Sequence, residues 1–396
     1  MSTARVATPQ RLFAFTLIGI GAASTAAHLG NNFTTYLIGG LMDRFGFSPT
    51  AMGAWNMAET LSYAAAMFVV APRARAMDAR VLGLLATLLI ATAQAGSALM
   101  TAYPLLLLGR IGTGLGYGLM NSAVNLAAGR TANPTRWISM GIAFQTIMFS
   151  AINIGLPIIG KSNGVAGMFT ALAGLSCILG LLAMLLPGGT GLEGDVASPE
   201  PKAPIGAEGR RVLAAMALFA FGTLAIWPFM ERTAHAIGLP ATQFGRYQSL
   251  ATLLSALGNA GLAVVVKRLP RTWPLAAALG ACGLACALLT TVRSEPAFAI
   301  ALVAFNVSWF LTYPLLLGLA YSIDSTGRLA VMTTGTWLLS QSFGSLAAGV
   351  IAQNFGGYTL IGPMGAMICL ASIAVAWPIA KRLDGRLPEP ARPLVE

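Results

Sequence analysis

The chain contains two related halves, offset by the 192 residues that separate Gly46 from Gly238. The segment Gly46-Phe-Ser-Pro-Thr50-Ala-Met-Gly53 returns as Gly238-Leu-Pro-Ala-Thr242-Gln-Phe-Gly245. The same offset joins pairs at the ends of apolar segments: Pro104 and Pro296, Arg136 and Arg328, Met140 and Met332, Gly164 and Gly356. Two like halves in an apolar chain are typical of helical bundles that carry a solute through a membrane.

The composition places the chain in a membrane. Of its 396 residues 56% are hydrophobic and 9% are charged, whereas about a quarter of the residues in soluble proteins are charged. A span needs about 20 apolar residues, and twelve such segments can be placed. We predict an all-α membrane protein with twelve transmembrane helices in two six-helix repeats, at 12–39, 49–71, 81–102, 105–127, 137–160, 165–186, 212–236, 241–266, 274–292, 297–321, 329–352 and 361–380.

The predicted organisation is a six-helix bundle over 1–186, a linker over 187–211, and a second bundle over 212–396 that ends in a short tail. The linker is the one long polar stretch and is rich in Gly, Pro and acidic residues. Most of the 24 Lys and Arg residues fall on the side of the linker and the termini. That side is therefore expected to be cytoplasmic. We also expect 12–39 to be retained rather than cleaved, because 212–236 would otherwise lose its counterpart.

Several function classes are disfavoured by the sequence. The cysteines lie in apolar runs without metal-ligand spacing to His28 or His235, so neither a disulfide nor a metal site is expected. The net charge of +11 is spread between apolar segments, which indicates topology rather than nucleic-acid binding. We find no catalytic triad and no phosphate-binding loop, so we expect no enzyme, no cofactor, and an ion gradient as the energy source.

The two-times-six arrangement with a central linker resembles the major facilitator superfamily over essentially the whole chain. Leu108-Gly-Arg110-Ile-Gly-Thr-Gly114-Leu-Gly116-Tyr-Gly118 is similar to the family's Arg-x-x-x-Gly-x-Gly motif in the fourth span. The family's charged loop after the second span is represented by Arg75-Ala-Met-Asp78-Ala-Arg80, and its copy by Lys267-Arg268-Leu-Pro-Arg271. The resemblance implies gating roles for Asp78, Lys267, Arg268 and Arg271. Gly155-Leu-Pro157-Ile-Ile-Gly160 is a displaced form of the family's antiporter signature, which favours import over efflux.

Ionisable residues inside spans are functional candidates, because burying a charge in hydrocarbon is costly. Glu59 lies about 11 residues, or roughly 17 Å, from the outer end of the second span. His28 lies at a similar depth, roughly 18 Å, in the first span. A buried carboxylate beside an imidazole can titrate near physiological pH. We interpret the two as a candidate proton-coupling pair, with a plain polar contact between helices as the alternative.

Arg110, Glu231 and Arg246 lie closer to the outer ends of their spans, at roughly 9 Å. Glu231 and Arg246 are predicted to form an ion pair, either as an outer gate or as a static contact, and Arg232 to extend to the interface. Arg110 is a candidate for binding an anionic substrate, because a guanidinium matches a carboxylate with two hydrogen bonds.

In the superfamily the first, fourth, seventh and tenth spans line the cavity. The resemblance therefore implies that polar and aromatic residues on these four spans of this chain line a cavity as well. Asn306, Trp309 and Tyr313 share one helical stripe, as do Tyr117 and Asn121. Such residues pack against their neighbours more often than they bind ligands. The substrate-binding candidates are Arg110, Asn31, Asn32, Tyr36, Tyr117, Asn121, Trp227, Asn306, Trp309 and Tyr313.

The sequence thus favours a monomeric secondary transporter in a bacterial inner membrane, with both termini cytoplasmic. It would move a small organic solute, preferably an organic or aromatic acid anion, by alternating access and with import coupled to protons. A proton-coupled multidrug efflux antiporter is the first alternative. A membrane scaffold or sensor that no longer transports is the second.

Overall fold

The computed structural model describes residues 9–131, 133–188, 205–265, 269–324 and 328–385, and what it describes is helical with connecting turns. The α-helices of the first half are α1 (Pro9–Ala27), α2 (Leu29–Phe45), α3 (Pro49–Val70), α4 (Ala79–Leu99), α5 (Tyr103–Gly129) and α6 (Pro134–Ala183). Those of the second half are α7 (Ala207–Leu224), α8 (Met230–His235), α9 (Ala241–Val265), α10 (Thr272–Thr291), α11 (Glu295–Ile323), α12 (Arg328–Asn354) and α13 (Ile361–Asp384). Two 3₁₀ helices, η1 (Ala71–Ala76) and η2 (Trp227–Phe229), complete the described elements.

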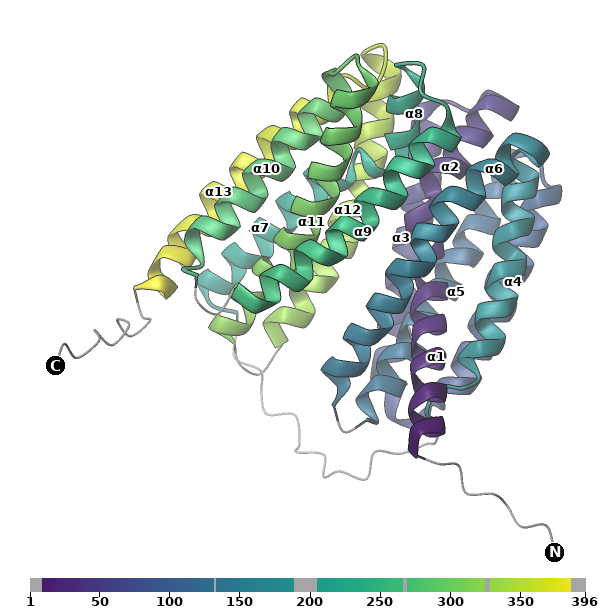
Figure 1. Cartoon of the computed structure of the whole chain (residues 1–396), viewed down its shortest axis with the longest axis horizontal. Helices are drawn as coiled ribbons and strands as arrows, with labels where there is room; N and C mark the ends of the chain where they lie inside the picture. The colour runs from purple at the N-terminus through teal and green to yellow at the C-terminus, as the bar shows by residue number, and fades with distance from the viewer. Residues whose placement is uncertain (1–8, 132, 189–204, 266–268, 325–327, 386–396) are drawn as a thin grey trace, which may run out of the picture.

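The helices form two six-pass bundles that stand side by side (Figure 1). The first consists of α1 with α2, then α3, α4, α5 and the two arms of α6. The second consists of α7 with η2 and α8, then α9, α10, α11, α12 and α13. Seven segments within the described residues are both long and apolar enough to cross a membrane. One of them, Arg136–Ala183, supplies two passes because it folds back at Gly164. The predicted all-α fold of two six-helix repeats is confirmed.

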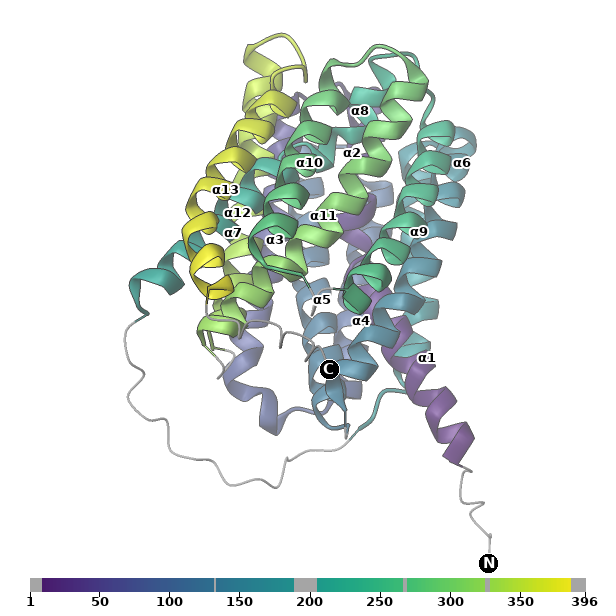
Figure 2. The same cartoon turned by 60° about the vertical axis from the view of Figure 1, so that its left-hand side comes forward.

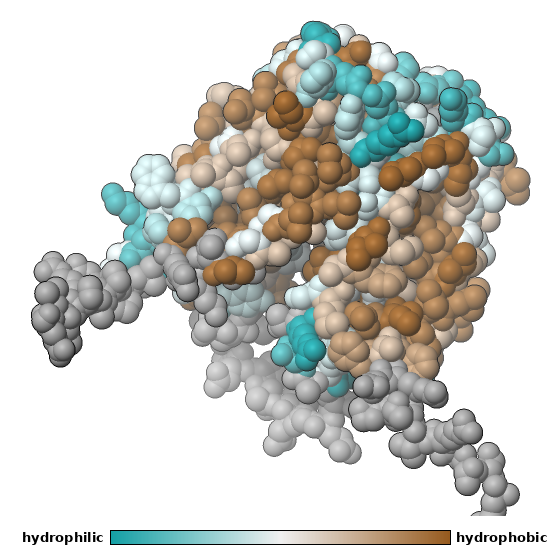
Figure 3. Space-filling view, in the orientation of Figure 1, coloured by the Kyte–Doolittle hydropathy of each residue, from teal (hydrophilic) through white to brown (hydrophobic). Residues whose placement is uncertain are grey.

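The remaining passes, α3, α5, α9 and α12, have 22, 27, 25 and 27 residues. Two of them, α3 and α12, pack against each other between the bundles, and α9 packs on α6 (Figure 2). Apolar residues cover the flanks of both bundles, whereas hydrophilic ones gather mostly at the upper end (Figure 3). This pattern fits a protein whose sides face lipid and whose ends face water.

The repeat appears directly in the backbone. Gly46 and Gly238, which are 192 residues apart, have φ of 67° and 82°. Gly164 and Gly356, at the same offset, have φ of 65° and 69°. A left-handed backbone favours glycine because it lacks a Cβ atom. Both pairs therefore mark equivalent reversals of the chain, and Gly164 divides α6 into the two predicted spans.

The first pass of each bundle is interrupted near its middle. His28 separates α1 from α2, with φ of −117° and ψ of 7°, and η2 separates α7 from α8. Breaks of this kind free backbone groups inside the membrane, and they are tolerated where the helix is buried in protein or borders a cavity. The interruptions bring His28 and Trp227 to the region between the bundles.

The bundles are joined mainly at the end that lies away from the first residue of α1 and the last residue of α13, here called the far side. The opposite end is called the terminal side. On the far side Thr50 Oγ1 donates to Gly349 O (3.3 Å), and deeper in the membrane Asn56 Nδ2 donates to Ser345 Oγ (2.7 Å). Between α6 and α9 the hydroxyls of Ser150 and Ser249 lie 2.6 Å apart.

Candidate functional site

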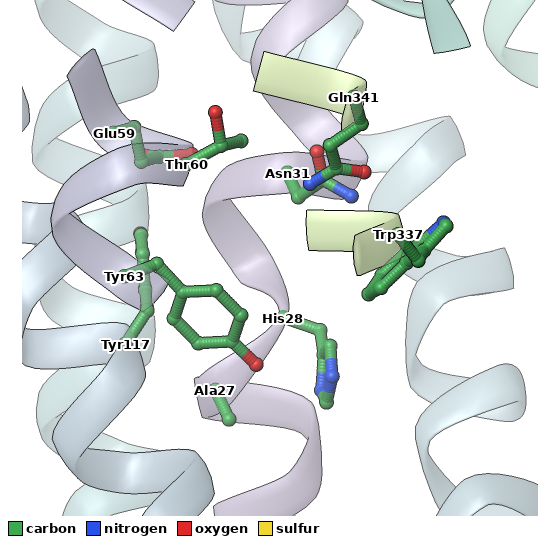
Figure 4. A pocket seen from close by; sticks show the side chains of 9 residues that line it. All are labelled: Ala27, His28, Asn31, Glu59, Thr60, Tyr63, Tyr117, Trp337 and Gln341. Carbon is green, nitrogen blue, oxygen red and sulfur yellow. The ribbon is translucent and has the colours of Figure 1, made fainter. Parts of the chain in front are cut away.

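A small pocket lies between the first bundle and α12 of the second (Figure 4). It borders the break in the first pass, because His28 is one of its lining residues. Its walls combine aromatic rings with carboxylate, amide and imidazole groups. The lining residues are Ala27, His28, Asn31, Glu59, Thr60, Tyr63, Tyr117, Trp337 and Gln341.

Glu59 is the acidic group of this pocket, and its partner is Arg110. Oε2 of Glu59 lies 2.7 Å from Nη1 of Arg110, and the two residues are 2% and 1% exposed. The Thr113 hydroxyl lies 3.2 Å from the same oxygen. The other carboxylate oxygen, Oε1, is buried and has no hydrogen-bond partner. One side of the carboxylate is therefore compensated, and its other oxygen is unsatisfied.

Arg110 is held behind Glu59 by contacts on several sides. Its guanidinium carbon lies 3.9 Å from the centre of the Trp55 ring, and Nη2 donates to Thr34 Oγ1. A cation over an indole face is favourable, most of all when it is desolvated. Arg110 is not among the residues that line the pocket. The predicted contact between Arg110 and an anionic substrate is therefore not formed in this geometry, because the guanidinium is already paired and enclosed.

His28 and Glu59 line the same pocket but do not form the predicted pair. Nδ1 of His28 lies 2.9 Å from the Ser24 carbonyl oxygen, which identifies Nδ1 as the protonated nitrogen. The imidazole packs edge-on against Tyr63, with ring centres 6.4 Å apart. Glu59 meets Arg110 instead, because the long arginine side chain reaches from its shallower position on α5.

An aromatic cluster extends the pocket wall into the second bundle. Trp309 and Tyr313 of α11 stack with ring centres 5.9 Å apart, at 6.2 and 5.5 Å from Trp337. The indole nitrogens of Trp309 and Trp337 are buried without a hydrogen-bond partner. The predicted stripe on α11 thus contributes two rings beside the pocket. Its third member, Asn306, points elsewhere and bonds to Gln248 (3.0 Å).

The other predicted cavity residues divide into two groups. Asn31 and Tyr117 line the pocket, and the Tyr117 hydroxyl accepts a hydrogen bond from Gln94 (2.9 Å). The second group makes contacts within the protein. Asn32 bonds to His28 O, Tyr36 to Asn153, Asn121 to Met67 Sδ and Trp227 to Asn31 O.

A charged cluster joins the two bundles on the far side. Arg232 of α8 donates two hydrogen bonds to Asp43 of α2, at 2.6 and 2.9 Å, and its Nε lies 2.8 Å from Glu231 Oε2. Glu231 and Arg232 are buried, whereas the Asp43 side chain is 61% exposed. The predicted pair of Glu231 with Arg246 is wrong, because Glu231 is bound to Arg232 and Arg246 lies exposed on α9. We refer to Asp43, Glu231 and Arg232 as the far-side cluster.

The comparisons with known proteins agree with this architecture. The family model described as "Major Facilitator Superfamily" matches residues 18–333. The chain belongs to the major facilitator superfamily. No curated protein matches the sequence. Similarity to solved members of the superfamily lies in the fold and not in the sequence.

Three solved superfamily structures illustrate this. The nucleoside transporter NupG shares 12% identity at a TM-score of 0.70, with 94% of this chain and 99% of that one covered. The human organic anion transporter MFSD10 shares 15% at 0.64, with 93% and 100% covered. A D-xylose–proton symporter shares 13% at 0.70, with 91% and 97% covered. At these identities the likeness shows the fold alone.

The superfamily's loops on the terminal side are only partly described. Asp78 caps α4, since its Oδ1 accepts from the backbone nitrogens of Arg80 (2.7 Å) and Val81 (3.3 Å). In the second bundle the backbone nitrogen of Arg271 donates to Asp384 of α13 (2.6 Å). Lys267 and Arg268 lie outside the described residues. The gating roles expected for these residues stay predictions.

Trp337 and Gln341, which α12 contributes to the pocket, are not among the candidates predicted from the sequence. The resemblance to the superfamily points to the first, fourth, seventh and tenth spans as the cavity walls, and α12 is not one of these. The signal was nevertheless present, since an indole and an amide lie four residues apart and therefore on one face of an apolar helix. Asp43 was missed as well, although it is the one acidic residue in the first span and its turn.

Proposed function

We propose that this superfamily member is a proton-coupled secondary transporter of a small organic solute and that Glu59 carries the coupled proton. The observation that supports it is the position of Glu59, which is buried beside the pocket between the bundles. An ionised carboxylate at such a site is costly unless it is paired. Glu59 can be neutralised by a proton or compensated by Arg110, so its protonation and the occupancy of the pocket are coupled.

The pair also suggests how the cycle proceeds. With Glu59 ionised, Arg110 holds it through Oε2 and ties α3 to α5. With Glu59 protonated, the attraction is lost, and the contacts of the bundle around the pocket change. A transporter needs such a two-state element whose balance depends on its ligands. The D-xylose–proton symporter of the same fold is a precedent for coupling to protons, although not for this residue.

The contacts between the bundles support an orientation for the state observed. We place the protein in a bacterial inner membrane as a monomer with both termini in the cytoplasm, as the distribution of Lys and Arg indicates. The far side then faces outward, and the far-side cluster and the Thr50–Gly349 bond close the bundles there. The structure would correspond to an inward-facing state, from which an importer releases its solute.

The substrate class needs revision relative to the sequence. The preference for an organic anion rested on Arg110, which is paired with Glu59 and 1% exposed. None of the side chains lining the pocket is a lysine or an arginine. We therefore retain a small organic solute and drop the preference for an anion.

The test uses proteoliposomes that contain a pH-sensitive dye. A transported solute added outside should acidify the lumen if protons accompany it inward. The Glu59→Gln variant should lose this signal but keep exchange of labelled for unlabelled solute, since exchange requires no net proton movement. Proton movement by the variant at the wild-type rate would refute the role of Glu59.

Two other outcomes identify the rival functions. Alkalinisation of the lumen by an added solute would show proton-coupled efflux in place of import. Absence of both proton movement and exchange across sugars, nucleosides, carboxylates and amines would favour a scaffold or sensor. The melting temperature of each variant is measured alongside, so that a folding defect is recognised.

A further inference from the structure

We propose that the pocket binds an uncharged, flat ring solute whose edge carries adjacent hydrogen-bond donor and acceptor groups, and that Trp337 and Gln341 of α12 select it. The chemistry is that of a nucleobase or a related cyclic amide. This inference rests on the transport function proposed above and specifies its substrate class. Its basis is the set of polar atoms around the pocket that no protein group satisfies.

Three such atoms belong to residues that line the pocket. Gln341 Oε1 and Glu59 Oε1 are acceptors without a donor, and Trp337 Nε1 is a donor without an acceptor. Gln341 and Glu59 are 3% and 2% exposed. Most buried polar atoms in proteins are hydrogen-bonded, and one left unsatisfied is costly. A solute that supplies two donors and one acceptor would satisfy all three atoms.

The spacing of these groups matches the edge of a ring. Trp337 and Gln341 are four residues apart on α12, so their side chains lie on the same helix face, about 6 Å apart at the Cβ atoms. Figure 4 shows Gln341 beside Asn31 of α2 at one end of the pocket, with Trp337 next to them. An amide that offers both a donor and an acceptor suits a base edge, which carries the complementary pair.

The walls favour a flat partner. Tyr63 and Tyr117 line the pocket from the first bundle, and Trp337 lines it from the second. Trp337 is itself supported by Trp309 and Tyr313. Aromatic side chains bind planar rings by stacking and do so whatever the exact ring. The pocket itself is small, so the solute must be small as well.

The charges around the pocket argue against ions. An anion would approach the unsatisfied oxygen of Glu59 and find no lysine or arginine in the lining. A cation would meet a carboxylate whose charge Arg110 already balances at 2.7 Å. The pocket therefore stabilises neither an anion nor a cation. An uncharged solute avoids the cost of desolvating an ion.

The first experiment measures binding to the purified full chain in lipid nanodiscs. The uncharged ring probes are uracil, uridine and adenosine. The contrasting probes are benzoate as an anion, benzylamine as a cation, and xylose as an uncharged solute without an aromatic ring. We expect saturable binding of at least one ring probe, and binding of each contrasting probe at least about tenfold weaker. Binding of none of the ring probes, or tighter binding of any contrasting probe, would overturn the proposal.

The second experiment changes the pocket. Gln341→Leu should weaken binding of the ring probe about tenfold. Trp337→Phe keeps an aromatic ring for stacking but removes the indole N–H, and should weaken binding about fivefold. Gln353→Leu, on an exposed site of the same helix, and Trp273→Phe, which is 67% exposed, are the matched controls and should not change binding. Equal affinities of the pocket variants and the controls would contradict the proposal.

A third measurement needs no variant and therefore does not depend on the folding of one. Methylation of uridine at N3 removes the ring donor that Gln341 or Glu59 would accept, so 3-methyluridine should bind about tenfold more weakly to the unmodified protein. Equal binding of the two would exclude recognition of the ring edge. Binding is measured without a proton gradient, so failure here leaves the proton-coupling proposal standing. Conversely, ring binding without any transport would refute the transport function alone.

Discussion

Glu59 and Arg110 form a buried ion pair between α3 and α5 in which only one carboxylate oxygen is compensated. Nη1 of Arg110 lies 2.7 Å from Oε2 of Glu59, and Oε1 has no partner. Such a pair need not stabilise the fold relative to apolar residues, because desolvation offsets the attraction. Removing only one of the two partners is costly, since the other charge then remains in the membrane without a counter-charge.

Arg110→Met should therefore destabilise the protein by roughly 3–5 kcal/mol, because it leaves Glu59 without a counter-charge. Adding Glu59→Gln in the same chain should recover most of that loss. Arg110→Lys should give an intermediate loss, since an ammonium does not reproduce the planar contact with Trp55. The measurement is thermal unfolding in one detergent for Arg110→Met, Arg110→Lys, Glu59→Gln and the double variant Arg110→Met with Glu59→Gln. Additive effects of the two substitutions would show that the pair is not coupled.

The Glu59–Arg110 contact shows where depth estimates from sequence fail. Counting from the first residues of α3 and α5 places Glu59 about 15 Å and Arg110 about 10 Å into their helices. A difference of about 5 Å separates two Cα positions, but an extended arginine side chain covers it. Counting residues estimates the depth of the backbone but not the direction of the side chain, and the sequence therefore predicts His28 as the partner of Glu59, whereas the structure has Arg110 there.

The glycine motif of α5 predicts a packing constraint. A Cβ atom at Gly114 would meet Ser62 Oγ and the backbone of Glu59, and one at Gly118 would meet the backbone of Tyr63. Gly114→Ala or Gly118→Ala must therefore push α3 away from α5, at a cost of about 1–3 kcal/mol. Both should also reduce solute-dependent proton movement, because Glu59 and Tyr63 are displaced.

Gly129 provides the control within the same helix, because a Cβ atom there would meet nothing within 4 Å. Gly129→Ala should be neutral or stabilise the helix by up to about 1 kcal/mol. Thermal unfolding and proton movement are measured on all three variants. Equal destabilisation by Ala at positions 114 and 129 would contradict a packing role for the motif.

The repeat was the most reliable part of the prediction from sequence. Positive φ occurs at both repeated glycine pairs, Gly46 with Gly238 and Gly164 with Gly356. A chain reversal of this kind favours glycine at that position, and the sequence therefore records it directly. The pocket was less predictable. Trp337 and Gln341 are identified as lining residues only when α12 is placed against α3, and that contact depends on the packing of two bundles. Likewise, Glu231 was expected to pair with Arg246, since the unwinding of the seventh pass at η2 is not evident from its apolar pattern.

Asp384 is expected to fix the start of α10 from a distant part of the chain. Its oxygens accept from the backbone nitrogens of Arg271 (2.6 Å) and Thr272 (2.9 Å), and from the Thr272 hydroxyl. Asp384→Ala leaves those backbone donors unsatisfied and should cost about 1–2 kcal/mol, as for other helix caps. Thr272→Val keeps both backbone bonds and should cost less. A melting temperature equally lowered by the two substitutions would assign the effect to the hydroxyl bond instead.

The far-side cluster should set the balance between inward-facing and outward-facing states. Asp43 is 61% exposed, so water screens its bond to Arg232, and we expect a contribution of roughly 0.5–1 kcal/mol. Asp43→Asn should then favour the outward-facing state about two- to fivefold without impairing folding. Arg232→Met should act differently, because it leaves buried Glu231 without its counter-charge and lowers the melting temperature as well.

The readout is a cysteine that replaces Ala27 in the pocket of a chain whose native cysteines are changed to serine or alanine. Its labelling by a maleimide that cannot cross the membrane, added from the outside of oriented vesicles, reports how often the pocket opens outward. Asp43→Asn should accelerate the labelling, whereas Arg246→Gln, on the exposed surface of α9, should not. Unchanged labelling in Asp43→Asn would mean that the Asp43–Arg232 bond does not keep the far side closed, and that other contacts such as Thr50–Gly349 do so without it.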